Sequence, residues 1–228
     1  QLARVGHDVT VYEKNEKPGG LLRYGIPDFK LSKAVLDRRI EQMQAEGVKF
    51  VTGTAVGPNK FASGVCSRAK KVIDAGKILK GFDAVVLCGG SEEPRDIKIP
   101  GRELKGVHFA LELLQACNRE QAREGASEIN VKARDVIVIG GGDTGADVVG
   151  VAHRQGARSV MQVEIHPMPP EKEDKLAEWP EWPKKLRTSA FHEEGCDRRW
   201  CFGTKEFLGD KKGGLRAVKA VELEWSID

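Results

Sequence analysis

The chain has 228 residues, of which 40% are hydrophobic and 31% charged, a composition that excludes a disordered, fibrous or membrane-embedded protein. At about 150 residues per domain, this length predicts two small domains and leaves enough chain for a sizeable core. Lysines and arginines number 37 against 34 acidic residues, so the net charge is only +3. So small an excess gives no reason to expect nucleic acid or a membrane surface as a partner.

The apolar runs and the cysteines indicate a cytoplasmic protein. Apolar runs such as 84–88 and 136–139 are far shorter than the roughly 20 residues that cross a bilayer, and no secretory signal precedes the first strand. The five cysteines form no CxxC pair, which fits reduced thiols. A metal or thiol site on His192, Cys196 and Cys201 is the weakest hypothesis, because the two cysteines are too isolated for zinc or iron–sulfur binding.

The first residues are typical of the middle of a dinucleotide-binding βαβ unit. Residues 1–6 predict the last turn of a helix that Gly6 ends, and residues 9–13 predict a strand that closes on Glu13. In such a unit this is the second strand, and its terminal acid binds a ribose hydroxyl. The first strand and its glycine-rich loop would then lie upstream, so we expect a truncated chain. The alternative is that Glu13 is merely a solvated strand end.

The rest of the first half predicts a turn, a helix and two strands. Residues 18–22 form a tight turn whose glycines let the backbone approach a ligand closely. Helical spacing of apolar residues follows the N-cap Ser32 and ends before Gly47. The expectations that follow, in chain order, are a strand at 48–52, loop or short helix at 57–81, a buried strand at 82–88 and an extended connector at 94–101. We place the domain boundary in this connector, between residues 96 and 97.

One glycine motif follows a strand and opens a helix. Residues 135–139 predict a buried parallel strand, and a helix at 146–154 and a strand at 159–164 follow. The first glycine of such a motif turns the chain, the second admits a pyrophosphate, and the third packs the helix on the strand. The helix N-terminus then faces the phosphates. The predicted nucleotide-binding turn consists of Gly140, Gly141, Gly142, Asp143, Thr144 and Gly145. The alternative is a glycine-rich turn without a ligand.

The choice between NAD and NADP stays open on these residues. Glu164 ends the second strand of this unit, where an acid would hold a 2′-hydroxyl and favour NAD. Four basic residues could instead meet a 2′-phosphate: Arg154, Arg158, His166 and Lys172. Arg158 is equally well explained as a surface charge at the entrance of the strand.

The last third of the chain predicts an irregular loop and a hairpin. Residues 168–183 contain four prolines together with Trp179 and Trp182, and we expect the two rings to pack, over a cofactor or on the domain surface. Residues 204–208, the turn 209–214 and the alternating segment 215–225 predict a β-hairpin.

Several segments carry a resemblance to a known family. They are GGLLRYGIPDFK at 19–30, GGS at 89–91 with PRD at 94–96, the motif at 140–145, HEEGC at 192–196 and TKEFL at 204–208. Taken in order, they resemble the small (beta) subunit of glutamate synthase over essentially the whole chain.

The resemblance implies an α/β flavoprotein of the two-dinucleotide-binding-domain type, in which a Rossmann-like NAD(P)H domain is inserted into an FAD domain. Residues 1–96 would be a partial FAD domain and residues 97–228 the NAD(P)H domain with its hairpin. Hydride would pass from NADPH to FAD, and electrons would reach the large subunit through iron–sulfur clusters, to make glutamate from glutamine and 2-oxoglutarate. No acid–base residue is assigned, because hydride transfer between cofactors needs none. The implied FAD residues are Glu13, Gly19, Gly20, Leu21 and Lys30, and the implied candidates for the 2′-phosphate are His166 and Lys172. The family uses NADPH more often than NADH, so the resemblance favours NADP.

The sequence also departs from the family pattern. The family's N-terminal cysteine segment for iron–sulfur clusters, the first FAD strand and the C-terminal segment that closes on the flavin do not occur in it. We therefore expect residues 1–96 to hold FAD weakly or not at all. The alternatives are the flavoprotein part of a related reductase, such as dihydropyrimidine dehydrogenase or a ferredoxin:NADP oxidoreductase, and a nucleotide-binding or docking module without turnover.

Overall fold

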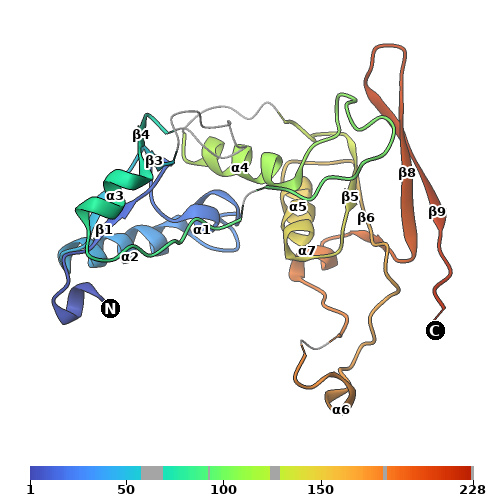
Figure 1. Cartoon of the computed structure of the whole chain (residues 1–228). Coiled ribbons are helices and arrows are strands. Elements are labelled where there is room, and N and C mark those ends of the chain that lie inside the picture. The colour runs from blue at the N-terminus through green and yellow to red at the C-terminus, as the bar shows by residue number, and fades with distance from the viewer. Residues whose placement is uncertain (58–68, 92, 124–128, 182–183, 227–228) are drawn as a thin grey trace. The chain divides into compact units, whose positions relative to one another are not determined.

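The structure is a computed structural model that describes residues 1–57, 69–91, 93–123, 129–181 and 184–226. The chain divides into two compact units (Figure 1). The first comprises residues 1–95 and 118–125, and the second comprises residues 96–117 and 126–228.

The first unit holds two small parallel sheets. Strand β1 pairs with β2, with Val11 opposite Phe50, and β3 pairs with β4, with Ala55 opposite Val72. A 3₁₀ turn ends at Gly6, whose N–H donates to the Ala3 carbonyl. The elements are η1 (Ala3–Val5), β1 (Thr10–Tyr12), α1 (Gly20–Tyr24), α2 (Lys33–Ala45), β2 (Lys49–Val51), β3 (Thr54–Val56), β4 (Lys71–Ile73) and α3 (Ala75–Gly81).

The second unit is built on a three-stranded parallel sheet in the order β5-β6-β7. Helix α5 connects β5 to β6, which makes the βαβ unit predicted from the glycine motif. Its elements are α4 (Ala110–Gln121), which runs on past the end of this unit's segment, β5 (Asp135–Ile139), α5 (Asp143–Arg154), β6 (Ser159–Val163), α6 (Lys175–Glu178), α7 (Ala190–Glu193), β7 (Asp197–Arg199), β8 (Phe202–Gly209) and β9 (Leu215–Glu222).

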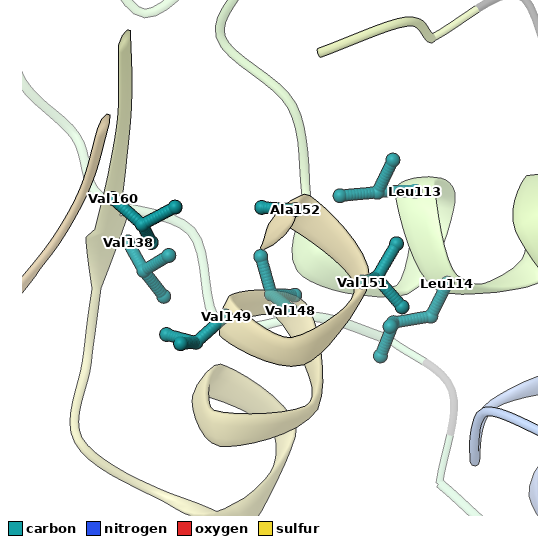
Figure 2. Close-up of a cluster of buried hydrophobic side chains, with 8 residues drawn as sticks. All are labelled: Leu113, Leu114, Val138, Val148, Val149, Val151, Ala152 and Val160. Carbon is teal, nitrogen blue, oxygen red and sulfur yellow. The ribbon is translucent and has the colours of Figure 1, made fainter. Parts of the chain in front are cut away.

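A cluster of buried aliphatic side chains lies between α5, the strands and α4 (Figure 2). Val138 and Val160 come from β5 and β6, and Leu113 and Leu114 come from α4. Helix α5 contributes Val148, Val149, Val151 and Ala152. Because this core holds β5 and α5 together, it also fixes the turn that connects them.

The hairpin of β8 and β9 is tied to the start of the second unit. The Phe207 N–H donates to the Pro100 carbonyl at 2.9 Å, and the Leu215 N–H donates to the Lys105 carbonyl at 2.8 Å. Gly101 has a φ of +80°, and any Cβ there would fall on the Phe207 carbonyl. The segment 100–105 therefore forms a clasp on the hairpin.

Most predicted elements are confirmed, namely the helical turn before Gly6, the strands β1, β2, β5 and β6, the helices α2 and α5, and the hairpin. Strand β5 is parallel as predicted, but the expected burial is wrong, because Ile137 and Ile139 are each 43% exposed. The α/β class with parallel sheets is also confirmed. Residues 18–22 hold both the predicted turn and the start of α1. Within the described part of the segment 57–81, β4 and α3 form, and residues 58–68 lie outside the described residues.

The buried strand predicted at 82–88 is wrong. The described residues provide no partner strand for this segment, and Val86 and Leu87 are 71% and 92% exposed. An apolar run forms a strand only when a neighbour completes its hydrogen bonds. The expected packing also fails for Trp179, which is 83% exposed, and Trp182 lies outside the described residues. None of the helices in the described ranges is long and apolar enough to cross a membrane.

Candidate functional site

The glycine motif forms a tight turn between β5 and α5. Gly140 follows the last residue of β5 with a φ of +114°, a conformation that side-chain-bearing residues rarely adopt. Its N–H donates to the Val163 carbonyl at 2.8 Å, which continues the pairing of β5 with β6. The chain therefore turns immediately after the carboxyl end of the strand, where ligands bind in open α/β sheets.

Helix α5 begins at Asp143, with Gly142 as its N-cap in an extended conformation. The first intrahelical bond runs from the Ala146 N–H to the Gly142 carbonyl at 3.0 Å. The N–H groups of Asp143, Thr144 and Gly145 precede it, so the helix offers them no acceptor. Together with the positive end of the helix dipole, they can hold a phosphate group.

The third glycine of the motif packs against the turn itself. A Cβ on Gly145 would lie 2.5 Å from the Gly140 carbonyl oxygen and 2.8 Å from the Gln162 Nε2. Gly145 thus lets the first turn of α5 approach both the glycine turn and β6, as the motif requires.

Gln162 is a site residue that the sequence analysis missed. It lies in β6, is 2% exposed, and its Nε2 donates to the Gly140 carbonyl at 2.9 Å. The signal was available in the sequence, because one amide side chain interrupts the apolar pattern of a buried strand, Val160-Met161-Gln162-Val163. Buried polar side chains of this kind need a partner, and here the partner is the glycine turn.

Glu164 directly follows β6, as predicted, and its carboxylate bonds the glycine turn. Oε2 accepts from the Gly141 N–H at 2.5 Å, while Oε1 accepts from the Ile165 N–H at 3.0 Å and more weakly from the His166 N–H at 3.5 Å. A Cβ on Gly141 would lie 2.6 Å from Oε2, so the carboxylate approaches this residue closely. These bonds place a negative charge beside the glycine turn.

The basic residues considered for a 2′-phosphate lie in three different places. Arg158 pairs with Asp135, the first residue of β5, with its Nε donating to Oδ1 at 2.8 Å. It therefore lies at the opposite end of the strand from the glycine turn, and we leave it out of the site. Arg154, in the last turn of α5, forms two bonds to Glu194 at 2.7 and 2.9 Å.

His166 and Lys172 follow β6 and Glu164 along the chain. The His166 ring packs against Trp225 with 5.3 Å between centroids and a tilt of 38° between the planes, and the Trp225 Nε1–H donates to the Ile165 carbonyl at 3.0 Å. Lys172 is exposed, six positions further along the chain. Of the four basic residues, these two remain as candidates for the 2′-phosphate.

The residues implied for FAD lie in the first unit. Glu13 directly follows β1, and its Oε1 accepts from the Asn15 N–H at 2.8 Å and from Nδ2 of the same residue at 3.0 Å. Gly19 and Gly20 open α1 with φ values of +127° and +49°. Leu21 is in α1, and Lys30 is an exposed residue between α1 and α2.

The cysteine hypothesis finds little support in the geometry. Burial raises the pKa of the Cys196 thiol, which disfavours a nucleophilic thiolate. Burial lowers the pKa of His192, whose Nδ1 accepts from the Ser189 N–H at 3.1 Å in a capping box. Within the described ranges, no group of three or more His, Cys, Asp or Glu side chains is arranged to hold a metal ion.

Comparison with known proteins identifies the family. The family model described as "Pyridine nucleotide-disulphide oxidoreductase" matches residues 1–185. The chain belongs to this family. A glycine turn of the observed geometry is what a family of pyridine-nucleotide enzymes requires.

Within this family the chain is similar to glutamate synthases, which confirms the resemblance drawn from the sequence. It is 45% identical to the glutamate synthase [NADPH] small chain of Mycobacterium tuberculosis over 98% of this chain and 44% of that protein. It is 40% identical to the glutamate synthase [NADH] of Saccharomyces cerevisiae over 98% of this chain and 10% of that protein. The chain thus spans less than half the length of these relatives.

A solved structure supports the fold. FprA from Mycobacterium tuberculosis, as a His57Gln mutant, matches with a TM-score of 0.68 and 17% identity over 100% of this chain and 60% of that protein. FprA in complex with NADPH matches with a TM-score of 0.59 over 93% of this chain and 60% of that protein. At this identity the likeness concerns the fold alone.

Proposed function

We propose that the chain is part of the electron-input subunit of a glutamate synthase and that its second unit binds NADPH. The observation that carries this proposal is the turn from Gly140 to Gly145, which lies between the parallel strand β5 and the N-terminus of α5. Similarity to small chains of glutamate synthase over 98% of the chain supports the assignment to this enzyme rather than to a related reductase.

In this proposal the backbone of the glycine turn holds the nucleotide. The N–H groups of Asp143, Thr144 and Gly145 receive the pyrophosphate at the start of α5, while Gly140, Gly141 and Gly142 let it approach the backbone. His166 and Lys172 receive the 2′-phosphate. The protein's task is to bind and orient the nicotinamide, so no acid–base side chain is needed.

In the first unit, the proposed FAD residues are Glu13, Gly19, Gly20, Leu21 and Lys30. The left-handed conformations of Gly19 and Gly20 are compatible with close approach of a dinucleotide to the backbone. FAD, when bound, supplies the flavin that accepts hydride and passes electrons on. The proposed partner is the large subunit of glutamate synthase, with iron–sulfur clusters outside this chain as the electron carriers.

NADH is a second candidate, and the Glu164 carboxylate favours it. A carboxylate beside the glycine turn attracts a ribose diol and repels a 2′-phosphate. The relatives include proteins named for each nucleotide. Titration of the chain with NADPH and NADH in parallel decides between them.

The test of the proposed function is nucleotide titration combined with a visible absorption spectrum. We expect NADPH to quench the fluorescence of the tryptophans, all four of which lie in the second unit. A flavin band that bleaches on addition of NADPH would support a working electron-input unit. Binding without a flavin band would support the nucleotide-binding module instead, and no binding of either nucleotide would contradict the proposal.

Two matched glycines separate loss of the site from loss of stability. Gly140 and Gly213 have φ values of +114° and +77°, and a Cβ on either would meet nothing within 4 Å. Gly140→Ala and Gly213→Ala should therefore introduce similar backbone strain. Only Gly140→Ala should weaken NADPH binding, because Gly213 lies in the turn of the hairpin.

A further inference from the structure

One peptide unit of the glycine turn is held at both ends by side chains from the same stretch of chain. The Gly140 carbonyl accepts from Gln162 Nε2 at 2.9 Å, and the Gly141 N–H donates to Glu164 Oε2 at 2.5 Å. These two groups belong to one planar trans peptide, so they point in opposite directions. Gln162 and Glu164 are two positions apart, which brings them to the same face of the sheet.

The orientation of the Gln162 amide is determined by its partner. A carbonyl oxygen only accepts hydrogen bonds, so the group that faces Gly140 must be the NH₂ end. The other end, Oε1, is buried and has no hydrogen-bond partner among the described residues. Burying an amide with one end unpaired is unfavourable, and an apolar residue at this position would avoid that penalty.

The residues that flank this peptide are themselves held in place. The Gly140 N–H donates to the Val163 carbonyl at 2.8 Å, and a Cβ added to Gly145 would lie 2.8 Å from the Gln162 Nε2. The backbone of Glu164 is fixed as well, because its N–H donates to the Arg199 carbonyl at 2.8 Å and its carbonyl accepts from the Phe202 N–H at 2.9 Å. Both side chains therefore act from rigid positions.

We propose that Gln162 is a positioning residue of the glycine turn, which together with Glu164 fixes the peptide between Gly140 and Gly141 before a nucleotide arrives. This peptide could otherwise flip and direct the Gly140 carbonyl toward the nucleotide phosphates, which it would repel. The inference rests on the proposed nucleotide site for its functional consequence. The fixed peptide itself is testable without any nucleotide.

The main variant is Gln162→Met, which keeps the length of the side chain and removes its donor. We expect NADPH to bind about tenfold more weakly, the loss equivalent to one hydrogen bond. The matched control is Gln155→Met. Gln155 is partly buried, also has an unpartnered buried Oε1, and caps the far end of α5. Affinity of the Gln155→Met protein should stay within twofold of the parent chain.

A second variant gives a pH-dependent signature that a merely structural role would not produce. In Gln162→Glu, the ionised carboxylate faces the Gly140 carbonyl and repels it, whereas the protonated acid can donate to it. Burial raises the pKa of such a carboxyl, so the acid form is accessible at mild pH. NADPH binding relative to the parent chain should be weak at about pH 8 and recover at about pH 5.5. No recovery would contradict the positioning role.

Amide hydrogen exchange of Gly141 tests the fixed peptide in the nucleotide-free chain. The Gly141 N–H should exchange slowly in the parent chain and at least tenfold faster in Gln162→Met, with no change in Gln155→Met. Equal exchange in all three proteins would overturn the inference. A parent chain that protects Gly141 but fails to bind NADPH would instead count against the proposed function alone.

Discussion

The two units contain similar apolar segments, but only the segment in the second unit forms a paired strand. In the second unit, the run 136–139 pairs with β6 and contributes Val138 to the buried cluster beside α5. In the first unit, the run 84–88 stays unpaired among the described residues and exposes Val86 and Leu87. An apolar run therefore forms a buried strand only where neighbouring segments pair with it and cover it, and the run itself does not determine whether they do.

The largest expected difference is in the free energy of unfolding, when the same change, leucine to alanine, is made once in each unit. Leu114→Ala removes a side chain that is 1% exposed, and we expect a loss of about 2–5 kcal/mol in the free energy of unfolding. Leu87→Ala removes one that is 92% exposed and should change stability by no more than about 0.5 kcal/mol. Urea unfolding followed by tryptophan fluorescence measures the first, and hydrogen exchange of residues 1–95 the second. Similar losses for both would remove the contrast between the units.

Two glycine-to-alanine substitutions, one in each unit, should change stability by smaller amounts and in opposite directions. Gly145→Ala should destabilise the second unit by about 1–3 kcal/mol, because its Cβ would meet the Gly140 carbonyl oxygen at 2.5 Å. Gly81→Ala, at the end of α3, meets nothing within 4 Å and should stabilise the first unit by about 0.4–1 kcal/mol. Thermal unfolding of each protein checks the signs. A stabilised Gly145→Ala would mean that the turn is not closely packed.

The smallest expected effect is on the loss of stability at acid pH, and it should be the same in both units. Arg158 holds the pKa of Asp135 at about 2, and Arg4 holds the pKa of Glu46 at about 2, both by hydrogen bonds to the carboxylate. Because each folded pKa lies below its usual value, the stabilisation is present above about pH 4 and is lost as the pH falls toward 2. Asp135→Asn and Glu46→Gln should each flatten the fall in stability over this range. Acid unfolding curves that stay unchanged would show that these exposed pairs contribute nothing.

The sequence predicted the nucleotide unit well because its signals are local. The glycine spacing, the apolar strand before it and the helix after it are all read from neighbouring residues, and the structure places them as expected. Strand β7 was missed because Asp197, Arg198 and Arg199 carry no apolar pattern and form a strand only by pairing with β6. Helix α4 was also missed, although Ala110, Leu113, Leu114 and Cys117 have helical spacing.

The sequence predicted the backbone of the site, the glycine turn, better than the side chains that surround it. Glu164 and the glycines follow from the motif, whereas Gln162 acts through a contact with a residue 22 positions away. The role of Arg158 was open for a similar reason. Sequence spacing does not tell at which end of the strands Arg158 lies. Its bond to Asp135 places it at the end opposite the glycine turn.

The clasp between residues 100–105 and the hairpin determines where the gene for the second unit could be shortened. A polypeptide that starts at residue 96 keeps the Pro100 and Lys105 carbonyls as acceptors for Phe207 and Leu215. One that starts at Ala110, at the first residue of α4, keeps every helix and strand of that unit but strips these acceptors from the hairpin. The outward-facing N–H groups would then be open to pairing with other molecules. The six residues 100–105 therefore decide whether the hairpin keeps these acceptors in a shortened polypeptide.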